Sequence, residues 1–321
     1  MFIGSCNGLV RRLDRATGAV RWETNVRGKA TGRYNFHGDV FIAPDRIVAS
    51  ADVPPGPNAE AGVHALDLQS GREVWREPIG RGVAGAVTGT ATRVFVYTIP
   101  GDLLALDLAS GRREWSFPMK ASAWESPAAA GSRVFGGSTD GSVYALNDET
   151  GRLEWERKLG AAVSTSIRVG DSGVYAGTSD GVMHRLDVAT GRALSSVELD
   201  GALQPAAAPL VRPDAVVVLL VDREANYRAL VSIDAAATRI NWRRAAPDRW
   251  TTSRVFATER TIVLGTPSGE VTAFCIADGA PAWSHKLTTG PIRSIGGGDE
   301  MLFVGTPQGT LYAVKAPRAC H

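Results

Sequence analysis

Residues that build metal and disulfide sites are scarce in this sequence. It holds three cysteines, Cys6, Cys275 and Cys320, and no two of them form a C-x-x-C pair. An odd number of cysteines without paired spacing predicts neither a disulfide framework nor a zinc knuckle. The five histidines form no H-E-x-x-H pair, and the sequence has no G-x-S-x-G nucleophile elbow. We therefore predict no metal and no cofactor.

Excess charge and long apolar runs are also lacking. The 35 Lys and Arg residues nearly balance the 33 Asp and Glu residues, which gives a net charge of +2. This composition favours neither a nucleic-acid partner nor a membrane surface. The longest aliphatic stretch, Ala215–Val221, has the length of a strand and not the roughly 20 residues of a membrane-spanning helix. The first residues, MFIGSCNGLVRR, lack the apolar core of a signal peptide. We expect no membrane insertion, and the compartment stays open.

A repeat of about forty residues runs through the chain. Its marker is a short segment with an aspartate or asparagine, a Thr-Gly or Ser-Gly pair and a final tryptophan. The strong copies are RLDRATGAVRW, ALDLQSGREVW, ALDLASGRREW and ALNDETGRLEW, which end at Trp22, Trp75, Trp115 and Trp155. The other copies are RLDVATGRALS, SIDAAATRINW and AFCIADGAPAW, which end at Ser195, Trp242 and Trp283. A period of this length is typical of folds built from repeated units.

Each marker follows a predicted β-hairpin. Asp140-Gly141 and Asp180-Gly181 have the composition of two-residue hairpin turns, and related turns occur at Asn7-Gly8, Ser268-Gly269 and Gln308-Gly309. Each repeat thus predicts an inner strand, a hairpin pair and an outer strand that carries the tryptophan, and such four-stranded units form propeller blades. We predict an all-β, eight-bladed β-propeller of four-stranded antiparallel blades with tryptophan-docking motifs. It forms a single domain over residues 1–321, with incomplete first and last blades.

The marker has a physical role in this architecture. The Asp or Asn and the hydroxyl residue bond to nearby backbone, the glycine accepts a positive φ, and the indole packs between blades. The pattern A-x-D-x-x-T/S-G-x-x-x-W resembles the tryptophan-docking motif of the pyrroloquinoline-quinone-type β-propeller repeats. That family includes quinoprotein alcohol dehydrogenases, BamB-like outer-membrane assembly lipoproteins and sensor or scaffold domains. The resemblance covers nearly the whole chain and implies the fold, but the motif does not distinguish these functions. Ser195, in place of the tryptophan, predicts a looser contact at that blade.

Three soft ligands fall close together in the repeat frame. Cys320 and His321 are adjacent, and Cys275 occupies a similar position one blade earlier. Such a set is able to bind a transition metal. A frayed C-terminus is the simpler interpretation, and we favour it.

Catalytic patterns are weak. The resemblance implies that dehydrogenases of this fold hold the quinone with a calcium ion, a carboxylate base and commonly a vicinal cysteine disulfide. This chain has no adjacent cysteines, and Glu125 is its only clear carboxylate near an inner strand. The residues GRGVAG at 80–85 match the G-x-G-x-x-G pattern of a dinucleotide-binding site, but no predicted helix follows them. Residues 222–226 begin like a calcium loop but lack its glycine and closing glutamate. We expect a non-catalytic protein, and quinone-dependent dehydrogenation is disfavoured.

A binding site is expected at the funnel rim, where loops from all blades meet. Alignment of the repeats places a chemically mixed set there: His37, Trp124, Glu125, Gln204, Thr252, Arg254 and Arg293. Trp124 and Trp250 are the two tryptophans outside the docking register, and aromatic residues beside arginines are typical of interface hot spots. The alternative is that these tryptophans plug the funnel mouth.

Two hairpins carry inserts, DVPPGPNAEAG at 52–62 and VDREANYR at 221–228. A long Pro- and Gly-rich loop favours a docking partner, although a neutral surface excursion fits equally well.

We predict a protein–protein interaction scaffold that binds a protein partner through one loop face and the funnel rim. The alternative is a propeller enzyme or sensor with a small molecule in the funnel. The BamB-like resemblance implies a periplasmic or extracytoplasmic setting.

Overall fold

The computed structural model describes residues 1–4, 8–26, 40–51, 61–80, 82–99, 101–123, 125–199, 204–222, 227–250, 255–298, 300–317 and 320. For residues 204–207, 227 and 247–250 it describes the backbone alone. Every helix or strand in these ranges is a β-strand, so they hold no helix that could cross a membrane.

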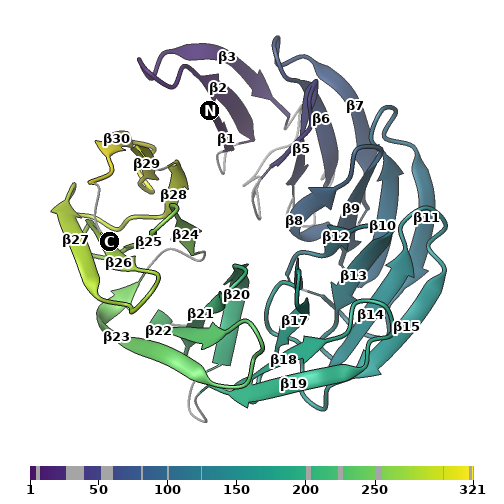
Figure 1. Ribbon diagram of the computed structural model, residues 1–321. Helices are drawn as coiled ribbons and strands as arrows, with labels where there is room; N and C mark the ends of the chain where they lie inside the picture. The colour runs from purple at the N-terminus through teal and green to yellow at the C-terminus, as the bar shows by residue number, and fades with distance from the viewer. Residues whose placement is uncertain are drawn as a thin grey trace. The chain divides into compact units, whose positions relative to one another are not determined.

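Residues Met1–Gly160 form one compact unit of four antiparallel sheets, in which the strands pair in chain order (Figure 1). Its first sheet has three strands and the others have four. The sheets are β1–β3 (Phe2–Gly4, Leu9–Leu13, Val20–Asn25), β4–β7 (Phe41–Ile42, Arg46–Ala51, Gly62–Asp67, Glu73–Pro78), β8–β11 (Val83–Gly89, Arg93–Thr98, Asp102–Asp107, Arg113–Pro118) and β12–β15 (Ala128–Ala130, Arg133–Gly137, Ser142–Asn147, Leu153–Lys158).

Residues Ala161–His321 form the second unit, with four further sheets. Its last sheet has three strands and the others have four. The sheets are β16–β19 (Arg168–Gly170, Gly173–Gly177, Val182–Leu186, Ala193–Glu198), β20–β23 (Gln204–Val211, Ala215–Val221, Tyr227–Asp234, Ile240–Trp250), β24–β27 (Phe256–Ala257, Thr261–Gly265, Glu270–Cys275, Pro281–Lys286) and β28–β30 (Ser294–Gly297, Met301–Gly305, Leu311–Lys315).

These sheets confirm the predicted all-β, eight-bladed β-propeller class. In the described residues, β1–β3 has no inner strand and β28–β30 has no outer strand, as expected for incomplete terminal blades. Single-domain organisation over residues 1–321 stays a prediction.

Within each unit, successive sheets pack face to face. On β9, Val94 and Val96 contact the β4–β7 sheet, whereas Phe95 and Tyr97 belong to a cluster with the β12–β15 sheet. Successive side chains of a strand point to opposite faces, so a strand between two sheets must be apolar on both. All four side chains are at most 1% exposed. Burial of each contributes roughly 1.5–3 kcal/mol.

The marker forms a tight turn between the third and fourth strands. At Asp107, the side chain accepts a 2.8 Å hydrogen bond from the Ser110 amide, and the Gly111 amide donates to the Asp107 carbonyl. The hydroxyl and amide of Ser110 hold the pKa of Asp107 below its usual range despite some desolvation. Gly111 has a φ of 74°, and the register shifts between Ala105 and Leu106 to form a β-bulge. The turn chemistry predicted for the marker is confirmed here.

The outer-strand indole lies on the turn of the next sheet. Trp75 Nε1 donates a 2.9 Å hydrogen bond to the Leu108 carbonyl, and a Cβ on Gly111 would lie 2.5 Å from the Trp75 ring. Only glycine fits at this position, because a Cβ would clash with the ring and because the backbone has a positive φ. The same close approach joins Trp22 to Gly71, Trp115 to Gly151 and Trp242 to Gly279.

Ser195 replaces the tryptophan on β19, and its turn partner has changed as well. The Ser195 hydroxyl donates to the Ala236 carbonyl, and the Tyr175 hydroxyl donates to the Ala235 carbonyl. Thr238 occupies the position where other turns have glycine, and Ala237, one residue earlier, has a φ of 51° and is fully buried. The contact expected to be looser is thus filled by two hydroxyl groups and a buried alanine.

The first turn, which ends at Gly18, has no docked indole within its own unit among the described residues. Gly18 has a φ of 72°, and a Cβ added to it would meet no heavy atom within 4 Å among the described residues. Arg15, at the position that matches Leu108, is exposed, as is Gly18. No described indole occupies this turn.

A matched pair of glycine substitutions tests the docking contact. Gly18→Ala should cost only about 1–2 kcal/mol of backbone strain, since its Cβ would meet no heavy atom within 4 Å among the described residues. Gly151→Ala should cost about 1–3 kcal/mol more, because its Cβ would lie 2.6 Å from the Trp115 ring. Urea denaturation measures both, and equal losses would contradict the account.

Candidate functional site

Two of the predicted rim residues, Glu125 and Arg293, are fully described. Arg293 is exposed before β28, and its backbone amide donates to the Gly305 carbonyl at 2.9 Å. Gln204 begins β20 and Trp250 ends β23, with the backbone alone described. The other predicted residues, which lie outside the described residues, are His37, Trp124, Thr252 and Arg254. The funnel rim therefore stays a prediction.

The loop at Glu125 packs tightly on β8. A Cβ on Gly85, which has a φ of 72°, would lie 2.7 Å from the Glu125 carbonyl oxygen. The Ala86 amide donates a 2.9 Å hydrogen bond to Ser126 Oγ, and Ser50 Oγ donates to the Gly85 carbonyl at 3.2 Å. Hydroxyl groups thus hold this inner loop against the strand beside it.

Tyr97 adds a buried hydroxyl to this set of polar side chains. Its side chain is 1% exposed, and its hydroxyl accepts a 3.0 Å hydrogen bond from the Gly137 amide. Burial raises the pKa of Tyr97; the hydrogen bond from the Gly137 amide opposes this rise, and the negative charge of Glu125 adds a smaller increase. Tyr97 stays neutral at ordinary pH and supports the backbone of β13.

The second unit repeats this pattern in the β16–β19 sheet. The Gly177 amide donates to the buried Thr165 Oγ1 at 2.9 Å. Thr178 Oγ1 lies 3.1 Å from His184 Nε2 and donates to Asp180. Burial lowers the pKa of His184, partly offset by the Asp180 charge. His184 therefore packs as a neutral imidazole in a hairpin.

A disulfide joins Cys275 and Cys320, with 5.7 Å between their Cα atoms. This corrects the prediction from the odd cysteine count and the missing C-x-x-C pair, although the two residues were expected to lie near each other. A signal was present in the repeat, because Cys275 stands at the position of Asp107 and Cys320 follows about one period later. In the part of the chain that the structure describes, no group of three His, Cys, Asp or Glu residues is placed to hold a metal ion.

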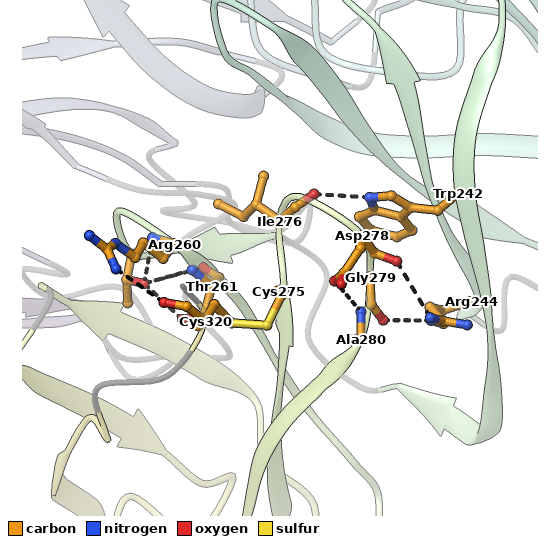
Figure 2. The surroundings of a disulfide bond; sticks show 11 residues. Trp242, Arg244, Arg260, Thr261, Cys275, Ile276, Asp278, Gly279, Ala280 and Cys320 are labelled. Carbon is orange, nitrogen blue, oxygen red and sulfur yellow. Dashed lines mark hydrogen bonds between the residues drawn. A yellow bond between two sulfur atoms is a disulfide. The ribbon is translucent and has the colours of Figure 1, made fainter.

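The disulfide shares its turn with a docked tryptophan (Figure 2). Trp242 Nε1 donates to the Ile276 carbonyl at 2.9 Å, and Arg244 Nε donates to the Gly279 carbonyl at 2.5 Å. Arg260 Nη1 donates to the Cys320 carbonyl at 3.1 Å. Cys320 is thereby fixed to the β24–β27 sheet.

Removal of the disulfide should destabilise the protein. The bond links residues 45 positions apart, and a loop of this length is typically worth about 2–4 kcal/mol. The Cys275→Ser/Cys320→Ser double variant should lose that much free energy of unfolding in guanidinium denaturation followed by tryptophan fluorescence. Cys6→Ser serves as the control that keeps the bond. An unchanged midpoint in the double variant would contradict this role.

Comparison with known proteins agrees with this fold and its repeat. The family model described as outer membrane protein assembly factor BamB matches residues 6–125 and 59–284, more than half of the chain. The chain belongs to the BamB family. This membership confirms the resemblance to the pyrroloquinoline-quinone-type propeller repeats. No curated protein matches the sequence.

Solved structures share the fold at low sequence identity. BamB from Moraxella catarrhalis matches with a TM-score of 0.77 and 19% identity, over 98% of this chain and 93% of that one. The computationally designed Ika8 protein matches with a TM-score of 0.80 and 15% identity, over 98% of this chain and 92% of its own. A natural assembly factor and a designed protein thus have the same fold, which by itself carries no function.

Proposed function

We propose that the chain is a non-catalytic interaction scaffold, a single propeller domain over residues 1–321 that binds a protein partner through its hairpin loops and inner-strand rim. Membership of the BamB family supports this function, because that family is named for an outer membrane protein assembly factor. An assembly factor acts on other proteins, and binding to them is its basic requirement.

The observation that carries the proposal is the use of hydroxyl groups at the inner ends of the sheets. Ser126 and Thr165 accept hydrogen bonds from backbone amides, and so does Tyr97. A general acid or base must instead reach a substrate with a pKa near the working pH. Burial moves the pKa of Tyr97 further from neutrality. These groups stabilise loops, which suits a rigid binding surface.

Two hairpins offer additional contact surface. Ala51 of β5 pairs with Gly62 of β6, and residues 52–61 connect them. Val221 of β21 pairs with Tyr227 of β22 across residues 222–226. The other predicted hairpin turns have only two residues, and longer loops on a rigid scaffold are favoured places for binding.

The Cys275–Cys320 disulfide favours an oxidising compartment for this function. An extracytoplasmic location would agree with the role of the assembly factor for which the family is named.

A quantitative pull-down with the tagged full-length chain tests the proposal. The wild type should retain a defined protein from an extract of the source cells. Retention should fall roughly tenfold on Trp124→Ala, since a hot-spot aromatic is worth more than about 1.4 kcal/mol. Replacement of residues 52–60 by a Gly-Ser linker of equal length should reduce it as well.

Leu153→Ala is the matched control, because it removes an exposed apolar side chain from the outer strand β15, 44% exposed in the wild type. Retention should survive this change. If no protein is retained, or if neither Trp124→Ala nor the replacement of residues 52–60 alters retention, the scaffold proposal is wrong.

A further inference from the structure

We propose that Arg185, on the β16–β19 sheet where it packs against the β20–β23 sheet, binds an acidic side chain, aspartate or glutamate, of a docked polypeptide. That polypeptide is the protein partner of the proposed function, on which this inference rests. The chemistry of Arg185 can be measured without the partner, so the two proposals can fail separately.

The first observation is a changed row of three side chains across the β16–β19 sheet. Arg185 of β18 pairs with Tyr175 on one side and with Ser195 on the other, and residues paired in this way share one face of a sheet. In the β8–β11 and β12–β15 sheets the same row is phenylalanine, alanine and tryptophan. A charged side chain thus replaces a small apolar one, and a hydroxyl replaces the indole beside it.

The guanidinium of Arg185 forms no hydrogen bond or ion pair with the described residues. Its Nε is buried without a partner. The terminal nitrogens are not enclosed in this way, and the side chain as a whole is partly exposed. A guanidinium carries several N–H donors and keeps its charge at all ordinary pH values. Arg185 therefore presents an unneutralised charge and unused donors to the solvent.

A second arginine in the same position of the repeat shows what Arg185 lacks. Arg12 of β2 pairs with the docking tryptophan of its own sheet. Its Nη1 donates to the Leu68 carbonyl at 2.9 Å and to Gln69 Oε1 at 2.6 Å. Both acceptors belong to the marker turn of the next sheet. An arginine at this position is thus satisfied when the turn supplies a carbonyl and a polar side chain.

The turn that Arg185 faces supplies neither. Ala236 stands at the position of the glutamine, so the side-chain acceptor is missing. The carbonyls of Ala235 and Ala236 accept hydrogen bonds from the hydroxyls of Tyr175 and Ser195 instead. The groups that replace the indole therefore occupy the acceptors that the arginine would use.

The acidic residue of this turn is engaged as well. Asp234 accepts hydrogen bonds from the Thr238 amide at 2.8 Å, the Thr238 hydroxyl at 2.7 Å and the Arg239 amide at 3.0 Å. Burial alone would raise the pKa of Asp234, but these bonds hold it below its usual range. The carboxylate completes its own turn and leaves Arg185 without an ion pair.

The β16–β19 sheet has also lost the ion pair found at the edge of a related sheet. In the β12–β15 sheet, Arg133 of the second strand lies 2.5 Å from Glu154 of the outer strand. Gly173 and Leu194 stand at these two positions in the β16–β19 sheet. A Cβ on Gly173 would lie 3.1 Å from Cγ of Arg185, so the glycine makes room for the arginine stem. The positive charge has thus moved to a position that has no acidic neighbour of its own.

A carboxylate is the ligand that fits these observations. The planar guanidinium binds carboxylate and phosphate groups through two parallel hydrogen bonds. Asp234 acts electrostatically on Tyr175 of the same row, and its negative charge disfavours a phosphate dianion over a singly charged carboxylate. One partly exposed arginine holds a free carboxylate weakly, whereas a carboxylate on a docked polypeptide has a high effective concentration. The ligand is therefore an acidic side chain of a polypeptide.

Proton–nitrogen NMR of the arginine side chains tests the site directly. The probe is the tripeptide Ac-Gly-Glu-Gly-NH2, whose only charge is its carboxylate. The Nε–H signal of Arg185, assigned with the Arg185→Lys variant, should shift in a saturable way. The signal of Arg12 should stay in place, because Arg12 is already bonded to its neighbouring turn. Ac-Gly-Gln-Gly-NH2 is the matched control and should cause no shift.

Three results of this titration would overturn the assignment. The glutamate peptide could leave the Arg185 signal unchanged, or the glutamine peptide could shift it equally. Inorganic phosphate could shift it at lower concentrations than the glutamate peptide, which would identify a phosphate site instead.

A pull-down of the partner separates this inference from the proposed function. Arg185→Gln should lower retention roughly tenfold. Arg192→Gln removes the same charge from an exposed arginine of the same sheet and should retain the partner like the wild type. Circular dichroism checks that both variants fold. Equal retention by Arg185→Gln would contradict the inference and leave the scaffold proposal standing. If the wild type retains no protein, the scaffold proposal is wrong and the tripeptide titration alone decides the site.

Discussion

The structure depends on one repeated contact, an indole that lies on the glycine of the next sheet's turn. The ring leaves no room for a Cβ, as the 2.5 Å approach at Gly111 shows, and its N–H satisfies the Leu108 carbonyl. A single contact thus combines apolar burial with a hydrogen bond to a turn that would otherwise expose its backbone. The same approach recurs where Trp22 lies on Gly71, Trp115 on Gly151 and Trp242 on Gly279, so the contact joins successive sheets within each unit.

The sheets differ from one another mainly where this contact is altered. At Ser195 the turn of the next sheet has also changed: Thr238 replaces its glycine, and the Tyr175 hydroxyl donates to the Ala235 carbonyl. At Cys275 the turn exchanges its usual aspartate for a disulfide that fixes the C-terminal tail. At the first of these sites the lost indole N–H is replaced, because the Tyr175 hydroxyl donates to the Ala235 carbonyl, which matches the Leu108 carbonyl that Trp75 bonds. The turn at Gly18 has no such replacement within its own unit among the described residues.

Sequence periodicity was sufficient to predict the fold because the marker encodes its own geometry. The spacing from Asp107 to Trp115 includes the turn, the bulge and the docking strand, and each is determined by local chemistry. The Cys275–Cys320 bond was missed because pairing between cysteines in neighbouring blades depends on packing, which residue spacing within one segment does not contain. The predicted rim could not be derived for a similar reason, since residues such as Glu125 and Arg293 lie in loops outside the repeat pattern.

The central claim is that Trp75 and Gly111 are energetically coupled, and a double-mutant cycle measures this directly. In the wild type, Gly111→Ala should cost the strain of its positive φ plus the clash with the ring. In a Trp75→Ala background, the clash is absent. The two substitutions should therefore be non-additive by at least about 1 kcal/mol in the free energy of unfolding. Additivity within about 0.5 kcal/mol would contradict the account, since it would mean that the glycine serves the turn alone.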